Sequence, residues 1–265
     1  MCIKNMCLSS NSINLVEVVI PIYRNTLSNL EMRSLRQTSE ILKRYRISII
    51  KPESLDVSEL LVSFPSFHVR SFRDEFFDGI TGYNSLMMSV DFYSSFQDSE
   101  YILICQTDAY VFRDELQEWC MEGYDYVGAP WLKKPIYNLP IVSWIMRLSY
   151  LRDKRLGRKN KQDLYNKVGN GGFSLRRVSS HLKVVVDERD RIVKYLSMRH
   201  HLYNEDVFWA NVESFRYPSA MRALAFSFDK YPSLCYRLNG RRLPFGCHGW
   251  FSRKMCGFWK DKICF

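Results

Sequence analysis

The sequence predicts an α/β fold in a single domain, with a mostly parallel central sheet flanked by helices. First, short β-branched runs alternate with amphipathic helical runs, as in strand–helix–strand units. Second, Tyr101–Cys105 is continuously apolar, which is typical of a strand buried on both faces. Third, 265 residues with 46% hydrophobic content can bury one large core. We therefore expect a Rossmann-like, nucleotide-binding sheet.

The first strand is expected at 16–23, where β-branched residues dominate. Ser28 and Glu31 then have the spacing of a capping box, which predicts the start of a helix. Apolar residues follow at helical spacing, at Leu27, Leu30, Leu35, Ile41, Leu42 and Tyr45. Further strands are expected at 47–51, where Pro52 ends the strand, and at 67–72.

A second helix is expected to begin at Thr81. Its apolar residues form one stripe that we interpret as core: Tyr83, Leu86, Met87, Val90 and Tyr93. Neither G-x-G-x-x-G after the first strand nor G-x-x-x-x-G-K-[ST] occurs, which argues against dinucleotide-binding and P-loop proteins.

Asp108 follows the apolar strand 101–105 almost directly. In open α/β sheets, ligands bind at the carboxyl ends of the strands. We therefore expect Asp108 to face a ligand. The alternative is a turn or a helix N-cap aspartate.

Three further clusters lie in the second half of the chain. Gly169–Gly172 contains three glycines, whose backbone can approach a ligand closely, although a tight turn would also use them. Glu205 and Asp206 are adjacent and point in different directions, so one can serve chemistry while the other caps a helix; a solvated helix start is the alternative. His248 lies between glycines, with aromatic residues on both sides. It is expected to be either a metal or phosphate ligand or a histidine packed in the protein.

The formal net charge of +10 is concentrated in one segment, 133–177, which holds twelve Lys or Arg and two Asp. Within it, 136–151 is apolar and aromatic, and 152–161 is strongly basic. The apolar part is too short to cross a bilayer but has the composition of a segment at an anionic membrane surface. The alternative is an ordinary loop and helix packed over the active site.

The cysteines are scattered, and several lie in apolar runs, which favours reduced thiols in a cytoplasmic protein. Cys247, Cys256, Cys264 and His248 could suggest zinc, but a C-x-x-C knuckle is missing. Residues 1–14 are polar and lack the apolar core of a secretory signal, so we expect an N-terminal tail there.

Taken in order, several motifs resemble those of GT-A-fold glycosyltransferases. They are Gln106-Thr107-Asp108, 124–131 (YDYVGAPW), 169–176 (GNGGFSLR), Asn204-Glu205-Asp206-Val207 and 247–250 (CHGW). The chain looks in particular like bacterial glycosyltransferase-like proteins found with capsule or O-antigen synthesis. The resemblance covers about 16–250. It implies a nucleotide-binding half at 15–112, an acceptor and catalytic half at 113–250 with the insertion 133–177, and a basic aromatic tail at 251–265.

The resemblance implies a transfer of a sugar from a UDP- or GDP-linked donor to a glycan or lipid-linked acceptor. Asp108 matches the last acid of the family's Asp-x-Asp motif, which holds Mn²⁺ or Mg²⁺ on the donor diphosphate, and His248 matches a histidine that completes this site. Gln106 replaces the first acid, and one carboxylate fewer weakens a site for a hard cation. The other donor-binding residues expected are Tyr23, Arg24, Asn84, Asn170, Gly171 and Gly172.

The Glu205-Asp206-Val207 element is similar to one in inverting enzymes, in which the aspartate is the base. Asp206 is therefore the expected catalytic base, with Glu205 as the second candidate. We expect a cytoplasmic enzyme, peripheral on the inner face of the membrane. Two alternatives stay open: an inactive membrane-associated scaffold with the same fold, and a nucleic-acid-binding protein, although the basic residues do not form a recognisable DNA or RNA module.

Overall fold

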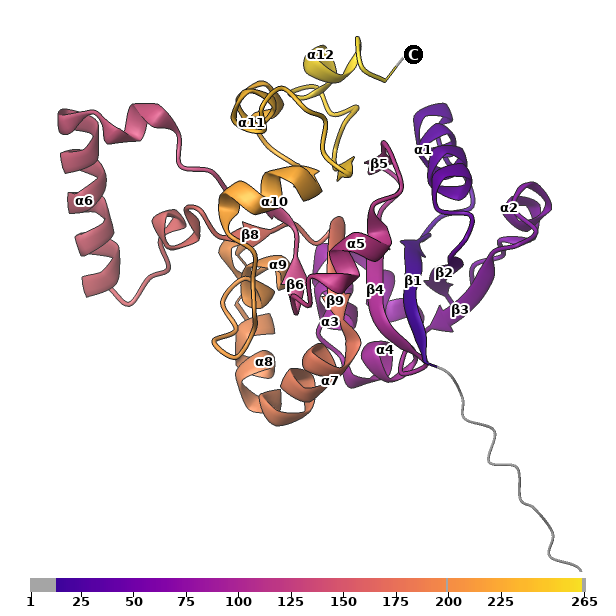
Figure 1. Ribbon diagram of the computed structural model, residues 1–265. Coiled ribbons are helices and arrows are strands. Elements are labelled where there is room, and N and C mark those ends of the chain that lie inside the picture. The colour runs from indigo at the N-terminus through magenta and orange to yellow at the C-terminus, as the bar shows by residue number, and fades with distance from the viewer. Residues whose placement is uncertain (1–12, 199, 264–265) are drawn as a thin grey trace, which may run out of the picture.

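A computed structural model describes residues 13–198 and 200–263. Its centre is a six-stranded sheet with the strand order β3-β2-β1-β4-β9-β6 (Figure 1). The bounds of these strands are β1 Asn14–Pro21, β2 Arg46–Pro52, β3 His68–Phe72, β4 Ser99–Cys105, β6 Tyr126–Val127 and β9 Phe173–Arg177. Strands β1 to β4 are parallel, whereas β9 runs antiparallel to both β4 and β6. The predicted α/β fold with a mostly parallel sheet is confirmed.

Helices cover both faces of this sheet. Alternate residues of one strand enter different hydrophobic clusters: Val18 and Leu103 lie on one face, and Val19 and Ile102 on the other. The first face packs against α1 (Asn29–Ile41) and α5 (Leu116–Met121). The opposite face packs against α3 (Gly79–Met87), α4 (Val90–Ser94), α7 (Val178–Asp187), α8 (Arg189–Leu196) and α9 (Glu205–Trp209). The fold is thus a three-layer α/β arrangement.

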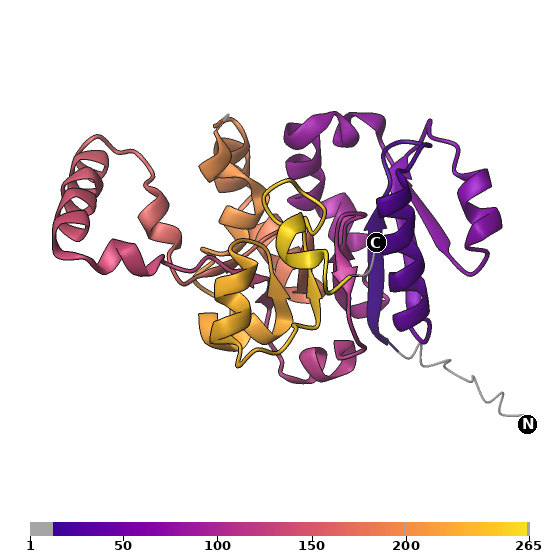
Figure 2. The same ribbon diagram turned by 90° about the horizontal axis from the view of Figure 1, so that it is seen from above.

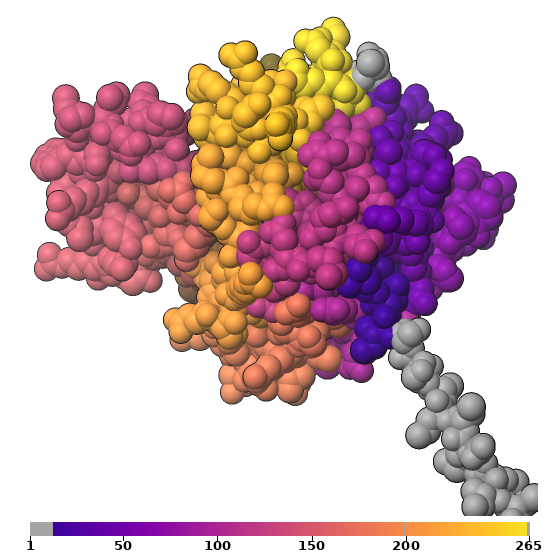
Figure 3. Space-filling view, in the orientation of Figure 1, coloured from indigo at the N-terminus to yellow at the C-terminus, as the bar shows by residue number. Residues whose placement is uncertain are grey.

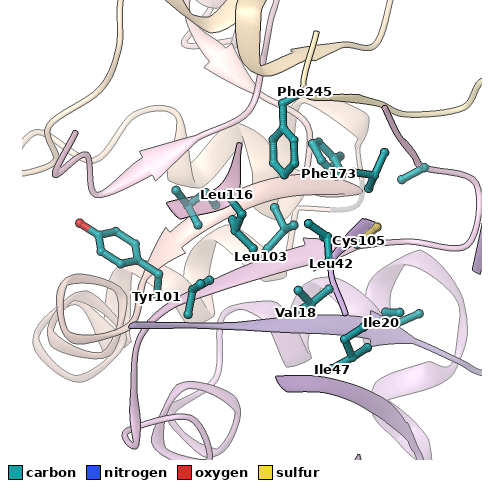
Figure 4. Close-up of a cluster of buried hydrophobic side chains, with 14 of the residues drawn as sticks. Val18, Ile20, Leu42, Ile47, Tyr101, Leu103, Cys105, Leu116, Phe173 and Phe245 are labelled. Atoms are coloured by element: carbon teal, nitrogen blue, oxygen red, sulfur yellow. The ribbon is translucent and has the colours of Figure 1, made fainter. Parts of the chain in front are cut away.

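The first hydrophobic cluster joins residues that lie far apart in the sequence (Figure 4). Val18 and Leu103 from neighbouring strands meet Leu42, which follows α1, and Phe245, near the end of the chain. All four side chains are fully buried. Burying each large apolar side chain contributes about 1.5–3 kcal/mol, so this cluster ties the second half of the chain to the central strands.

The local predictions for the first half are largely confirmed. The capping box is present, since the Ser28 side chain accepts from the Glu31 amide and the Glu31 carboxylate accepts from the Ser28 amide. The single helix expected from Thr81 is wrong: α3 ends at Met87 and α4 begins at Val90. Ser89 causes the break because its hydroxyl caps the Phe92 amide, and Val90 is consequently exposed rather than core.

Two small sheets accompany the central one; of their strands, β5 lies in the upper part of Figure 1 and β8 near its middle. One has the order β10-β11-β5, formed by Ser227–Phe228, Gly246–Cys247 and Tyr110–Val111. The other pairs β7 (Ala129–Pro130) with β8 (Val168–Gly169). Because β5 follows β4 directly, the first small sheet places His248 beside the carboxyl end of β4. Helices α10 (Ala220–Phe226), α11 (Pro232–Leu238) and α12 (Cys256–Trp259) complete this part, and α2 (Ser58–Ser63) precedes β3.

Helix α6 (Pro140–Arg155) stands away from the rest of the molecule (Figures 1 and 2). It is entered through the 3₁₀ turn η2 (Pro135–Asn138) and left through η3 (Lys161–Leu164). None of its residues is buried, so α6 itself does not pack against the body of the protein. In the part of the chain that the structure describes, we find no helix with the length and apolar character needed to cross a bilayer.

The described cysteines are free thiols. Cys105, Cys120, Cys235 and Cys247 are buried in apolar surroundings, as expected, and Cys256 is half-buried. Burial raises the pKa of the Cys105 thiol to about 12, which keeps it protonated and unreactive. Cys264, part of the zinc alternative, lies outside the described residues.

Candidate active site

The carboxyl end of β4 brings Gln106 and Asp108 to the imidazole of His248. Nε2 of His248 lies 3.1 Å from Oδ1 of Asp108 and 3.2 Å from Oε1 of Gln106. The histidine follows β11, which is joined to β4 through β5. Gln106, Asp108 and His248, all expected at the donor site, thus lie together. Gln106 and His248 are 142 positions apart in the sequence.

The other ring nitrogen of His248 faces Asp229. Nδ1 lies 3.3 Å from Oδ1 of that carboxylate. Burial opposes the charged imidazolium, but hydrogen bonds to Asp108 and Asp229 outweigh it and raise the pKa of His248 to about 10. Sequence reasoning missed Asp229, which follows the two-residue strand β10. The signal that could have found it is the same one that marked Asp108, an acid directly after an apolar strand.

These side chains fit a divalent cation that takes most of its ligands from a bound diphosphate. Asp108 offers a carboxylate oxygen and Gln106 an amide oxygen, and both lie within hydrogen-bond reach of the imidazole nitrogen Nε2 of His248. The described residues contain no group of three or more His, Cys, Asp or Glu arranged around a metal position. Asp108, Gln106 and His248 would supply three ligands at most, fewer than the about six that Mg²⁺ takes.

The glycine segment packs against the same residues. A Cβ on Gly172 would lie 2.1 Å from Nε2 of His248, and one on Gly171 would lie 1.7 Å from Oε1 of Glu205. Glycine is thus required at both positions by contact. Asn170 adopts a left-handed backbone with φ of 79°, and its Oδ1 accepts from the Gly172 amide at 2.9 Å. Its buried Nδ2 has no partner among the described residues, so it can donate to a ligand.

An ion pair with Arg176 holds the Glu205 carboxylate inside the protein. Arg176 is the final residue of the glycine-rich motif 169–176. The Nη2 atom of Arg176 lies 3.1 Å from Oε2 of Glu205, and the guanidinium also donates to Ser174 and to the Tyr93 hydroxyl. The Arg176 side chain is 0% exposed and that of Glu205 4%. Since its carboxylate is engaged and enclosed, Glu205 has the surroundings of a structural residue rather than of a catalytic base.

Asn84, expected to bind the donor, lies beneath this segment. Its Oδ1 accepts from the Glu205 backbone amide at 3.1 Å, and its Nδ2 approaches Oδ1 of Asn204 at 3.4 Å. Asn84 therefore holds the start of α9. Neither acid caps that helix as the sequence suggested; the N-cap residue is Asn204.

Asp206 points to a pocket of about 230 Å³, whose wall also includes Asp229. Asp206 is half-buried, and its Oδ1 accepts from the neighbouring Val207 amide at 2.8 Å. Burial, together with the adjacent Glu205 charge, raises the pKa of Asp206 to about 7. Such a carboxyl exchanges its proton readily near neutral pH, which is what a general base requires.

Aromatic rings and lysines form a large part of the pocket wall. The rings are those of Trp131, Tyr137, Tyr165 and Tyr231, and the lysines are Lys134, Lys161 and Lys230. Lys134 lies over the Tyr231 ring at 4.3 Å. Several of these residues belong to the ends of the α6 insertion, so the insertion and the body share this pocket. Sequence reasoning missed the pocket because its residues are dispersed along the chain.

Tyr23 and Arg24, at the end of β1, are exposed next to the carboxyl end of β4. Nη2 of Arg24 lies 2.6 Å from Oε1 of Glu31, and the same oxygen accepts from the Thr107 hydroxyl at 2.9 Å. The Glu31 carboxylate thus joins the end of β1 to the loop that carries Asp108. It also fixes the Arg24 guanidinium at the sheet edge where α/β proteins bind ligands.

The family model described as "Protein of unknown function (DUF5672)" matches residues 66–248. This range contains the end of β4 with Asp108, the glycine segment, both acids of α9 and His248, but not the end of β1. The chain belongs to this family. No curated protein matches the chain.

Solved structures with a similar fold include two of the galactosyltransferase LgtC. A galactosyltransferase, LgtC, in complex with donor and acceptor sugar analogues has a TM-score of 0.58 at 10% identity, covering 93% of each chain. A second LgtC structure, that of an active-site mutant, has a TM-score of 0.56 at 12% identity, covering 90% of each chain. At such identities the likeness shows the fold alone, which is the GT-A fold expected from the sequence motifs.

Proposed function

We propose that this protein is a glycosyltransferase that moves a sugar from a nucleotide-diphosphate donor to a hydroxyl of a glycan or lipid-linked acceptor. The proposal rests on one observation: two sets of side chains with different chemistry lie next to each other. Side chains whose chemistry suits a cation, Asp108 and His248, meet at the end of β4, and Asp206, whose pKa is raised to about 7, lines an adjoining pocket. The two sites share Asp229, which contacts His248 and also forms part of the pocket wall.

The donor would bind along the carboxyl ends of β1 and β4. Tyr23 and Arg24 would contact the nucleotide, and the Arg24 charge suits its phosphates. The free Nδ2 of Asn170 and the backbone of Gly171 and Gly172 would contact the donor beside Asp108. Glycines there allow close approach of backbone amides to an anionic ligand.

Mn²⁺ or Mg²⁺ would be held by Asp108 and His248, with Gln106 offering a neutral oxygen. When bound, such an ion stabilises the negative charge that grows on the departing diphosphate. Asp229 would orient the imidazole through Nδ1, so that Nε2 faces Asp108. With its pKa raised to about 10, His248 carries a proton on Nε2 near neutral pH, and a cation held there would have to replace that proton.

The acceptor would occupy the pocket that contains Asp206. Its aromatic walls suit the apolar C–H faces of a sugar ring, and its polar groups suit the hydroxyls. Asp206 would accept the proton of the attacking hydroxyl through a carboxylate oxygen, in a reaction that inverts the anomeric carbon. Glu205 would hold this segment in place through Arg176.

The setting that we propose is synthesis of a cell-surface polysaccharide such as capsule or O-antigen, in the cytoplasm and next to its membrane. The motif resemblance supports this setting, and the free buried thiols suit a reducing compartment.

A donor screen tests the proposal. The purified protein is incubated with UDP- and GDP-sugars, and release of the nucleotide is measured with and without EDTA. We expect release from one donor class, and a loss with EDTA that added Mn²⁺ or Mg²⁺ restores. Titration calorimetry with UDP, GDP and CMP separates the alternatives. An inactive scaffold binds none of the nucleotides, and that result would overturn the proposed function.

A further inference from the structure

Helix α6 presents an apolar stripe to the solvent. Its members recur every three or four residues and are Ile141, Trp144, Ile145, Leu148 and Leu151, exposed by 47% to 75%. This spacing places them on one face of a helix. An amphipathic helix ordinarily turns such a face toward the protein core, so the exposed stripe calls for another explanation.

The opposite face of α6 is the one that the protein itself contacts. The Tyr150 hydroxyl donates to Asp163 at 2.9 Å, and the Gln162 side chain donates to the Met146 carbonyl at 2.8 Å. Near the end of the helix, Nδ2 of Asn160 donates to Asp153 at 2.6 Å. These bonds tie α6 to the returning segment 160–163 and fix the apolar stripe outward.

Cations surround the end of the stripe. Arg152 and Arg155 continue it at the same helical spacing, and the other exposed cations nearby are Arg147, Lys154 and Arg158. Both acids of this region, Asp153 and Asp163, are engaged by the contacts of the returning segment. The outward side of α6 therefore combines an apolar surface with positive charge.

The insertion is tethered to the body at its base. Nζ of Lys159 lies 4.1 Å from the ring centre of Tyr195 and 4.3 Å from that of Tyr203. Beyond this anchor, the hairpin forms a separate lobe on one side of the molecule (Figure 3). At about 1.5 Å per residue, α6 is about 24 Å long and too short to span a bilayer core of about 30 Å.

We propose that α6 lies flat on an anionic lipid membrane, with the apolar stripe buried at the headgroup boundary and the cations on the lipid phosphates. The large exposed apolar face, its outward orientation and its flanking positive charge are the features of interfacial helices. Each Lys or Arg near an anionic surface strengthens the attraction to it. The inference stands apart from the proposed function, because it requires neither a nucleotide sugar nor a transfer reaction.

Co-sedimentation of the full-length protein with lipid vesicles tests this inference. We expect binding to phosphatidylglycerol-containing vesicles at low salt, at least about tenfold stronger than to pure phosphatidylcholine and weakened by high salt. Replacing Trp144, Ile145 and Leu148 with Ser should reduce binding at least about tenfold, because the apolar groups that enter the lipid are removed.

Matched variants separate the contribution of α6 from general electrostatics. Arg147, Arg152 and Arg155 are replaced with Gln in one variant, and Lys183, Arg189 and Lys194, exposed on α7 and α8, in the other. Both variants lose three positive charges, but only the α6 variant should dissociate from the vesicles. Equal loss in both would overturn the proposal in favour of general attraction to the basic protein.

Trp144 reports the depth of insertion directly. It is 63% exposed, whereas Trp119, Trp209, Trp250 and Trp259 are fully buried. Anionic vesicles should therefore shift the emission to the blue, lipids with brominated chains should quench it, and Trp144→Phe should abolish both effects. No shift, or a vesicle-independent dimer in gel filtration that the serine variant disrupts, would overturn the proposal; the dimer would assign the stripe to a second copy.

Discussion

Arg176 and Glu205 form an ion pair that is enclosed by the protein, with Nη2 and Oε2 3.1 Å apart. The carboxylate also fills the space that a Cβ on Gly171 would need. This pair therefore connects the glycine segment to the start of α9. The two adjacent acids therefore have different roles, because Glu205 is enclosed in the ion pair whereas Asp206 lines the pocket.

Removing the Glu205 charge should destabilise the fold. Glu205→Gln leaves the buried Arg176 guanidinium unpaired, which typically costs about 3–5 kcal/mol. Urea unfolding should show this loss, and Arg176→Met combined with Glu205→Gln should recover part of it because no buried charge remains. A Glu205→Gln protein with wild-type stability would contradict a structural role for the pair.

Asp206→Asn should lower turnover by about 10²–10⁴-fold, the usual contribution of a general base. Donor affinity should change little, since proton removal belongs to the transition state. Steady-state kinetics and calorimetric titration of the nucleotide measure the two quantities separately. An equal loss of nucleotide affinity would instead indicate that Asp206 positions the donor.

The pH dependence of activity should follow Asp206. With its pKa raised to about 7, kcat should increase about tenfold per pH unit below 7 and level off above it. In the Asp206→Asn variant, kcat should not show this increase with pH. A wild-type profile that is flat between about pH 5 and 8 would exclude this carboxyl as the base.

The same carboxyl should make stability fall as the pH rises. Its pKa increases from an ordinary value of 3.8 to about 7 in the folded protein. Between these values the folded state binds the extra proton, so the wild type should lose unfolding free energy relative to Asp206→Asn from about pH 4 to about pH 7. Urea unfolding of both proteins across this range measures the difference. Parallel pH dependences in the two proteins would show that the pKa of Asp206 is not raised by folding.

Asp108→Asn should reduce transfer by about 10²–10³-fold while the fold stays intact, because one charged group at the diphosphate is lost. Nucleotide binding in the presence of Mn²⁺ should weaken as well. Asp187→Asn, an exposed acid at the end of α7, is the matched control and should behave as wild type. Near wild-type turnover in Asp108→Asn would show that the donor site lies elsewhere.

Features that depend on neighbours along the chain could be predicted from the sequence. Alternating apolar runs predicted the strands, and Ser28 with Glu31 predicted the start of α1 through a local capping box. The position of Asp108 after a buried strand also followed from local pattern, because parallel strands present their carboxyl ends at one edge of a sheet.

The tertiary structure alone decided which distant side chains meet. Strand order and helix packing place Asp229 beside His248, Arg176 against Glu205 and Asn84 beneath α9. The two partners of each contact lie 19 to 121 positions apart in the sequence. Likewise, apolar periodicity reports that α6 has an apolar face but not where that face points. Its exposure follows from the placement of the hairpin beside the body, which periodicity along the chain does not encode.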